Sequence, residues 1–181
     1  GEVLDREGNK YDLQLKGSGR TPYSRGGDGK AWLGPVIREY VVSEYMNNIN
    51  IPTTRSLSAV LTGDNVYREE TYPGAVLCRV ARSHIRVGTF QYFYSRKDTK
   101  SLKILADYFI EHHFPNLEKN ENKYFELFKN VVDGQINLVT SWMKVGFIHG
   151  VMNTDNTSIS CETIDYGPCA FIDNYKSDKV F

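Results

Sequence analysis

Apolar and polar residues alternate in the first part of the chain with the two-residue period of β-strands. Residues 11–16, YDLQLK, predict a strand that ends at Lys16 on its polar face. Residues 76–81, VLCRVA, predict a further strand, and residues 59–67, AVLTGDNVY, predict a hairpin that turns at Thr-Gly-Asp-Asn. Together these strands indicate a small antiparallel sheet.

Other segments carry apolar residues at helical spacing. Residues 35–46 begin with a proline, which a first helical turn tolerates, and predict one helix. Residues 102–109 and 128–143 predict two more. Gly134 weakens the longest helix by about 1 kcal/mol relative to alanine, and Gly146 can end it.

The order of these elements indicates the fold class. A sheet with one helix, followed by helices that lead into a polar loop and an Asp-aromatic-Gly, is the order of a protein-kinase-like core. We therefore expect an α+β, two-lobed fold. Residues 1–98 would form an N-lobe with the nucleotide-binding sheet and helix, and residues 99–181 a partial helical C-lobe with the catalytic and metal-binding loops.

Composition narrows the choice of partners. The chain has 181 residues, with 22 basic and 22 acidic side chains and no formal net charge, so we expect no nucleic-acid partner. Because no segment offers about 18 continuous apolar residues and the start lacks a signal-peptide core, we expect a soluble protein without a membrane partner. The three cysteines lack disulfide or zinc spacing. The abrupt start and end predict a piece of a longer protein.

Residues 149–156, HGVMNTDN, form the most informative loop. In the kinase template a His is followed two residues later by a catalytic Asp and seven residues later by a metal-binding Asn. His149 and Asn156 keep this interval, but Val151 stands at the Asp position and cannot accept a proton. Asp155, beside Asn156, indicates that the base is relocated.

A second acidic motif follows at Asp-Tyr-Gly, where Asp165 matches the metal ligand of the kinase Asp-Phe-Gly. Mg²⁺ takes hard oxygen ligands, few of them from protein, so Asn156 and Asp165 are chemically sufficient. Asn153 and Thr154 favour turn or capping roles. His149 favours a structural role in the loop over a catalytic one.

Basic residues and glycines form the remaining candidates. Lys16 with Glu39 matches the pairing of a strand lysine with a helix carboxylate that places the lysine ammonium against phosphate oxygens in kinase-like folds. Residues 17–34 contain six of the 15 glycines, whose backbone N–H groups can approach an anion closely. Arg79 and Arg86 lie seven residues apart, so they converge on a phosphate only if the chain bends between them. Otherwise they are ordinary surface arginines.

Several separate motifs, which follow one another along nearly the whole chain, together resemble the selenoprotein O family of kinase-like proteins. They are LQLKGSGRTPYSRGGDGKAWLG, IREY, IPTTRSL, TYPGAVLCRVARSHIRVGTFQ, HGVMNTDNTSI and TIDYGPCAFID. The resemblance implies a protein adenylyltransferase that binds ATP in a flipped orientation and transfers AMP to Ser, Thr or Tyr hydroxyls of proteins.

The resemblance also implies roles for single residues. The nucleotide-binding residues would be Lys16, Asp28, Gly29, Glu39, Arg79, Arg86 and Asp165. Asp155 would take the proton of the substrate hydroxyl, and Asn156 with Asp165 would hold Mg²⁺. The family's upstream glycine segment and its C-terminal helical region with a cysteine or selenocysteine motif are not in this sequence.

Two rival functions stay open from the residues alone. One is a conventional protein kinase, and the other is a catalytically silent nucleotide-binding pseudokinase scaffold, which Val151 favours. ATP and Mg²⁺ are the expected cofactors both of an adenylyltransferase and of a conventional kinase. Members of the resembled family occur in bacteria and in mitochondria, which implies the cytoplasm for a bacterial source and the mitochondrion for a eukaryotic one. The sequence carries no signal for an oligomeric state.

Overall fold

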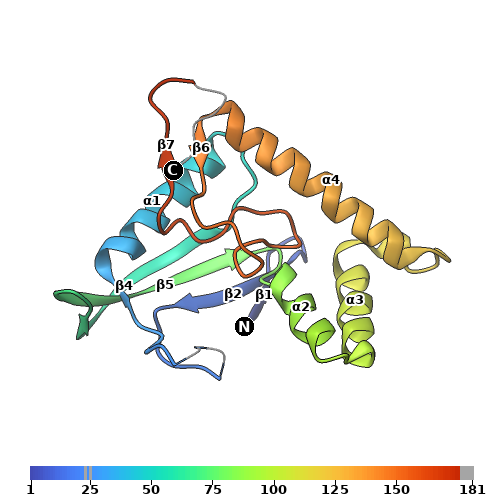
Figure 1. Ribbon diagram of the computed structural model, residues 1–181, viewed down its shortest axis with the longest axis horizontal. Helices are drawn as coiled ribbons and strands as arrows, with labels where there is room; N and C mark the ends of the chain where they lie inside the picture. The colour runs from blue at the N-terminus through green and yellow to red at the C-terminus, as the bar shows by residue number, and fades with distance from the viewer. Residues whose placement is uncertain (23, 25, 176–181) are drawn as a thin grey trace. The chain divides into compact units, whose positions relative to one another are not determined.

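The computed structural model describes residues 1–22, 24 and 26–175, which fall into two compact units (Figure 1). Unit 1 comprises Gly1–His84 and Thr163–Cys169, and unit 2 comprises Ile85–Glu162 and residues 170–175. No helix in the described part of the chain is both long and apolar enough to cross a lipid bilayer. The expected α+β class with an antiparallel sheet is confirmed, whereas the kinase-like lobes at 1–98 and 99–181 stay a prediction.

Unit 1 is built on a five-stranded antiparallel sheet. Its strands are β1 (Glu2–Leu4), β2 (Lys10–Lys16), β3 (Ala31–Trp32), β4 (Arg55–Tyr67) and β5 (Thr71–Ala81). β5 is the central strand, because β4 pairs along one edge while β2 and β3 share the other. Both alternating segments, 11–16 and 76–81, are therefore strands as predicted, and they pair with each other.

The hairpin turn predicted at residues 62–65 is wrong. These residues lie inside β4, where the register with β5 shifts between Leu61 and Asn65. Gly63 has a φ of +81°, and a glycine at positive φ serves a bulge as readily as a turn. The chain reverses later, where the Arg68 N–H donates to the Glu70 carbonyl at 2.9 Å.

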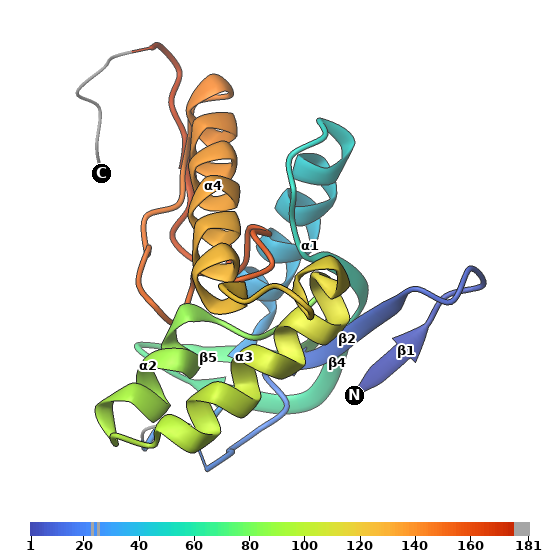
Figure 2. The same cartoon turned by 90° about the vertical axis from the view of Figure 1, so that its right-hand side faces the viewer.

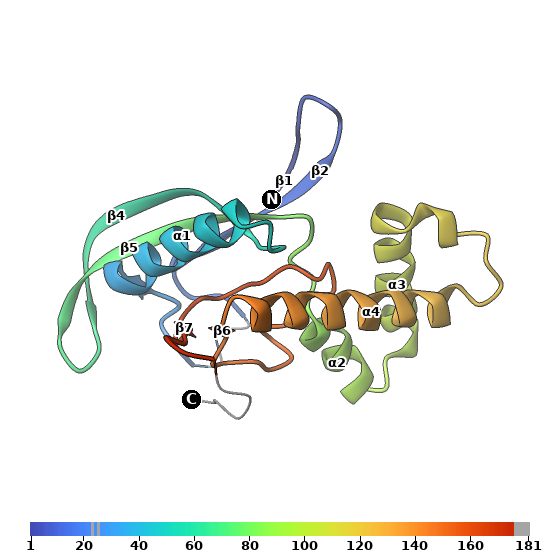
Figure 3. The ribbon, with the colours of Figure 1, turned by 90° about the horizontal axis from the view of Figure 1, so that it is seen from above.

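Helix α1 (Leu33–Asn48) packs along β4 and β5 (Figure 3). The predicted helix is confirmed, but its inner face is not its most apolar one. Val36 joins Ala75 and Leu77 in the core, and Glu39 is buried on the same face. The apolar residues that signalled the helix, Ile37, Tyr40, Val41 and Tyr45, are 37–58% exposed. A buried charge on α1 is tolerated only where partners compensate it.

Unit 2 is mainly helical. Its elements are α2 (Val87–Ser95), α3 (Thr99–His113), the 3₁₀ turn η1 (Pro115–Leu117), α4 (Lys123–Lys144), β6 (Phe147–Ile148) and β7 (Ala170–Phe171). α2 packs against α3 and α3 against α4, as Figure 2 shows. The two predicted helices, 102–109 and 128–143, are confirmed as α3 and α4, while α2 was not predicted. Gly146, with a φ of +66°, follows the end of α4 as expected.

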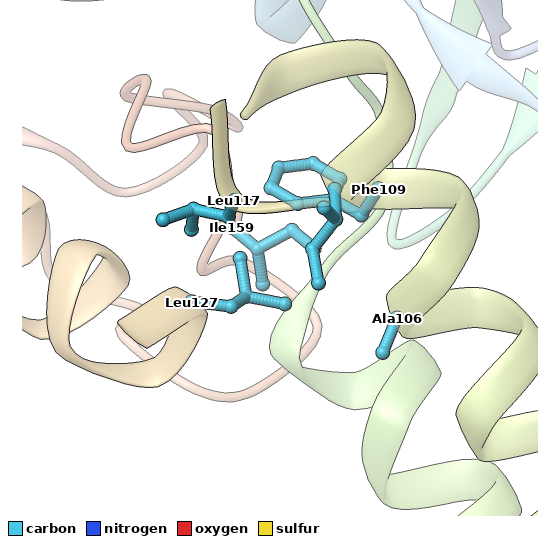
Figure 4. Close-up of a cluster of buried hydrophobic side chains, with 6 residues drawn as sticks. Ala106, Phe109, Leu117, Leu127 and Ile159 are labelled. Carbon is cyan, nitrogen blue, oxygen red and sulfur yellow. The ribbon is translucent and has the colours of Figure 1, made fainter. Parts of the chain in front are cut away.

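A cluster of buried side chains holds unit 2 together (Figure 4). Phe109 from α3, Leu117 from η1 and Leu127 from α4 converge with Ile159 from the loop that follows β6. Each fully buried aliphatic or aromatic side chain stabilises the fold by roughly 1.5–3 kcal/mol. Ile159 thereby anchors the segment that begins at His149 to the helices.

Candidate active site

The candidate site residues fall into two groups, one in each unit. In unit 1, β2 and β5 place Gln14 directly opposite Arg79. Because side chains two apart on a strand share a face, Gln14 and Lys16 point the same way. This polar face of β2 points toward Arg79 and Glu39, whereas Leu15 on the other face is 57% exposed.

Lys16 joins two carboxylates. Its Nζ lies 2.7 Å from Glu39 Oε2 and 2.6 Å from Asp165 Oδ1. The lysine is partly buried and Glu39 is 1% exposed. The structure therefore brings together three residues that are far apart in the sequence: a strand lysine, a helix glutamate and a loop aspartate.

Arg79 is the centre of the same group. Its guanidinium forms a two-pronged pair with Glu39, with Nε to Oε1 at 2.5 Å and Nη2 to Oε2 at 2.9 Å. Nη2 also lies 3.3 Å from Asp165 Oδ1, and Nη1 donates to Gln14 Oε1 at 2.9 Å. The planar guanidinium suits such paired contacts. We call Lys16, Glu39, Arg79 and Asp165 the charge cluster.

The electrostatics of the charge cluster follow from burial and neighbours. Burial disfavours the charged form of Glu39, but Arg79 and Lys16 outweigh it and hold the pKa of the Glu39 carboxyl below its ordinary value. Burial also opposes the charge on Arg79, yet Glu39 and Asp165 raise the pKa of its guanidinium. Both groups therefore stay ionised at neutral pH.

The Asp-Tyr-Gly segment is fixed to unit 1 by its neighbours. Tyr166 is fully buried, and its hydroxyl contacts Thr53 Oγ1. Arg38 Nη1 donates to the Gly167 carbonyl at 2.5 Å. Asp165 itself has a φ of +66°, so the left-handed residue of this turn is the aspartate, a residue type that tolerates the conformation.

Asp28 and Gly29 lie in the glycine-rich segment, outside the charge cluster. Asp28 accepts two hydrogen bonds from Arg68, which with the Lys30 amide lowers the pKa of the Asp28 carboxyl to about 2. Gly29 has a φ of +66°, and a Cβ there would overlap the Gly19 carbonyl. Only glycine fits this close approach. Nucleotide contact by both residues stays a prediction.

In unit 2, a tight turn presents Asp155 and Asn156. Asn153 Oδ1 accepts from the backbone N–H groups of Asp155 at 2.9 Å and Asn156 at 3.1 Å. The Asn153 carbonyl also accepts from Thr157 Oγ1 at 2.9 Å. An asparagine that binds the backbone two residues on is the expected turn chemistry, and it agrees with the turn role predicted for Asn153.

Arg86 lies beside this turn. It is the N-cap of α2, and its Nη1 donates to the Asp155 carbonyl at 2.7 Å. The strand that carries Arg79 ends at Ala81, so the two arginines do not share a continuous strand. Arg86 belongs to unit 2 and Arg79 to unit 1, and their joint contact with phosphate stays a prediction.

The neighbouring histidine has a packed environment. His149 is 3% exposed and stacks on Trp142, with ring centroids 5.5 Å apart. Its Nδ1 lies 3.4 Å from the Val151 N–H. These contacts support the structural role expected of His149.

The oxygen donors suit Mg²⁺ in type. The Asn156 Nδ2 donates to the Val151 carbonyl at 3.1 Å, so Oδ1 is the amide atom of a type that can coordinate a metal. Asp165 offers a carboxylate that contacts Lys16 and Arg79, two cations that it shares with Glu39. The described residues contain no group of three or more His, Cys, Asp or Glu placed to hold a metal. That Asn156 of unit 2 and Asp165 of unit 1 serve one Mg²⁺ ion stays a prediction.

Sequence reasoning missed Gln14 and the first turn of α2. Gln14 could have been found from its spacing, because it lies two residues before Lys16 on the same strand face. The α2 turn gave no such signal, since its contacts come from a loop more than 60 residues away.

Comparisons with known proteins agree with the motif pattern. A family model described as "Protein adenylyltransferase SelO" matches residues 1–180. The chain is 64% identical to "Protein nucleotidyltransferase YdiU" of Nitrobacter hamburgensis, 61% to that of Rhizobium rhizogenes and 58% to that of Shouchella clausii. Each match covers the whole chain but only 36–37% of the relative, so the chain spans about a third of the length of these curated relatives.

Proposed function

Because this chain belongs to the SelO family of protein adenylyltransferases, we propose that the protein transfers AMP from ATP to hydroxyl groups of other proteins. The acceptors are Ser, Thr or Tyr side chains, and ATP lies in the flipped orientation that exposes its α-phosphorus. The cofactors are ATP and Mg²⁺. The named relatives are bacterial, and we place the reaction in the cytoplasm.

The charge cluster is the observation that carries this proposal. Four ion pairs of 2.5–3.3 Å link two cations to two carboxylates, and Arg79 and Glu39 are almost fully buried. Keeping charges out of water costs several kcal/mol per ion unless they are paired. An arrangement that holds a lysine ammonium at a fixed place suits recognition of phosphate oxygens, and Lys16, at 22% exposed, is the cation of the cluster that retains access to solvent.

The chemical step is a nucleotidyl transfer. The acceptor hydroxyl oxygen attacks the α-phosphorus, the bond from that phosphorus to the pyrophosphate oxygen breaks, and pyrophosphate leaves. The hydroxyl proton passes to the Asp155 carboxylate. Lys16, Arg79 and Arg86 neutralise the negative charge of the β- and γ-phosphates, so the barrier falls through positioning and charge more than through covalent chemistry.

Two residues would hold the metal ion in this proposal. Asn156 and Asp165 would hold Mg²⁺, which supplies charge neutralisation on the phosphates. Asn153 fixes the backbone of Asp155 and Asn156 through hydrogen bonds. Glu39 acts indirectly, since it holds Lys16 and Arg79 in their positions.

The test uses the full-length protein, a protein acceptor and ATP labelled at either the α- or the γ-phosphate. We expect protein-bound label from α-labelled ATP alone. Label retained only from the γ position would support a conventional kinase instead. Magnesium-dependent ATP binding without transfer of either label would support a silent scaffold.

Two variants separate the proposed roles. Asp155→Ala should abolish transfer yet keep ATP binding within about threefold, because Asp155 acts on the acceptor's proton. Asp165→Ala should lose metal-dependent ATP binding as well. Near-normal turnover by Asp155→Ala would show that the base lies elsewhere.

A further inference from the structure

The first turn of α2 lies against the turn that carries Asp155. The Val87 N–H donates to the Thr157 carbonyl at 2.9 Å, and the Gly88 N–H donates to the Thr154 carbonyl at 2.6 Å. The first N–H groups of a helix have no partner within the helix. Here the loop supplies carbonyl partners, so the helix start and the loop are joined by their backbones.

Side chains strengthen the same contact at Asp155 and at the residue before it. Arg86 donates to the Asp155 carbonyl at 2.7 Å, and Thr154 Oγ1 donates to Gln91 Oε1 on α2 at 2.7 Å. The backbone at Asp155 is thus held to α2 from the residue before it and at the residue itself.

Gly88 has a steric relation to that carboxylate. A Cβ at position 88 would overlap Asp155 Oδ1 and lie 3.0 Å from the Thr154 carbonyl oxygen. Gly88 is not among the glycines with positive φ, so backbone conformation does not require a glycine here. Glycine inside a helix is normally disfavoured relative to alanine. The close approach of the Asp155 carboxylate, and to a lesser degree of the Thr154 carbonyl, is therefore the physical reason for a glycine at this position.

We propose that Gly88 is a positioning residue for Asp155: its missing side chain keeps open the space in which the Asp155 carboxylate stands. This inference rests on the proposed function, in which Asp155 takes the acceptor proton. The atom that would overlap most is the end of a flexible side chain, so an added methyl group would turn the carboxylate away, and the Thr154 carbonyl would yield by a few tenths of an ångström. Misplacing a catalytic group by about 1 Å can cost about 100-fold in rate.

The first arm of the test is structural and needs no activity. Crystal structures of the full-length wild type and of Gly88→Ala are compared with α2 superposed. We expect the Asp155 carboxylate to be displaced from the α2 N-terminus in the variant. The variant should keep helix α2, and the Tm of the protein should be unchanged. A carboxylate that stays in its wild-type position would overturn the inference.

The second arm is kinetic and uses label transfer from α-labelled ATP. We expect Gly88→Ala to lower kcat by about 100-fold with the KM for ATP within about threefold, since the nucleotide-holding charges are untouched. The matched control is Ser95→Ala at the other end of the same helix, where the hydroxyl donates to the Tyr92 carbonyl, and this variant should change kcat by about twofold or less. A Gly88→Ala enzyme with wild-type kcat would also overturn the inference.

These arms separate two kinds of failure. If wild-type protein transfers no AMP, the proposed function fails, and the catalytic part of the inference fails with it. If wild-type protein transfers AMP but Gly88→Ala matches it, only the positioning inference fails.

Discussion

The two groups of candidate residues are held in place by different physical means. The charge cluster of unit 1 is positioned by strands and a helix, and its members are bound to one another by buried ion pairs. The Asp155 turn of unit 2 is positioned by backbone hydrogen bonds, by Asn153 and by the first turn of α2. Buried charges depend on every partner being present, whereas a hydrogen-bonded turn depends on local acceptors and on space. The two groups should therefore fail in different ways when mutated.

The largest effect is expected at Glu39. Glu39→Ala leaves Arg79 buried without its two-pronged partner and should lower the free energy of unfolding by about 3–5 kcal/mol, measured by urea denaturation. The matched control is Glu44→Ala, which breaks the more exposed pair between Glu44 and Arg55 and should cost at most about 1 kcal/mol. Equal losses for the two variants would contradict the buried-pair interpretation.

Substitution of Gly134 tests how closely α4 packs against Cys161 in the loop that follows β6. A Cβ there would overlap Cys161 Sγ, and overpacking of this kind costs about 1–3 kcal/mol. That exceeds the gain of up to about 1 kcal/mol from replacing a helical glycine, so Gly134→Ala should lower Tm. In a Cys161→Gly background the overlap is absent, and the same substitution should leave Tm unchanged or raise it. A drop in Tm of equal size in both backgrounds would rule out this contact as the cause.

Asn153 tests the turn itself. Asn153→Ala removes the acceptor of two backbone N–H groups and should lower the AMP-transfer rate by about tenfold, equivalent to roughly 1.4 kcal/mol for two modest hydrogen bonds. Asn153→Asp keeps an acceptor oxygen and should recover part of this loss. The stability of unit 1 should not change in either variant. Full activity in Asn153→Ala would mean that the turn forms without its asparagine.

The smallest effect is expected in the pH dependence of stability. Because the folded-state pKa of Glu39 lies below its ordinary value of 4.5, the unfolded chain binds this proton more readily. The stabilisation from Glu39 is therefore present above pH 4.5 and is lost as the pH falls through the lower, folded-state pKa. Thermal unfolding followed against pH should show a shallower acid loss in Glu39→Gln than in wild type. Parallel curves would assign the acid loss to other carboxyl groups.

The sequence predicted elements better than it predicted their inner faces. Alternation identified β2 and helical spacing identified α1, α3 and α4. The buried face of α1, however, carries Glu39, because Lys16 and Arg79 from distant strands compensate its charge. No local pattern contains that information, since the partners lie 23 and 40 residues away in the chain.

Two other differences have local causes. Residues 62–65 have turn composition, but pairing of β4 with β5 on both sides turns them into a bulge. α2, VGTFQYFYS, is rich in residues that favour strands and was missed. Its start is stabilised by carbonyls of Thr154 and Thr157, which tertiary contact alone provides.

Part of the candidate site could be predicted from the sequence, and part could be recognised only in the structure. Lys16, Glu39 and Asp165 were expected to serve one nucleotide, and the structure brings them together with Arg79. The turn role of Asn153 followed from its residue type. Gln14, which its strand spacing could have indicated, was recognised from the pairing of β2 with β5, whereas Gly88 emerged only from the approach of α2 to the loop.

The central claim is that this family member adds AMP, and that Asp155 is required. The most direct measurement is mass spectrometry of an acceptor protein after incubation with Mg-ATP and either wild-type protein or Asp155→Ala. We predict that wild type adds the mass of one AMP to a Ser, Thr or Tyr residue, and that Asp155→Ala adds none. A phosphate adduct from wild type, or an AMP adduct from Asp155→Ala at the wild-type rate, would contradict the account.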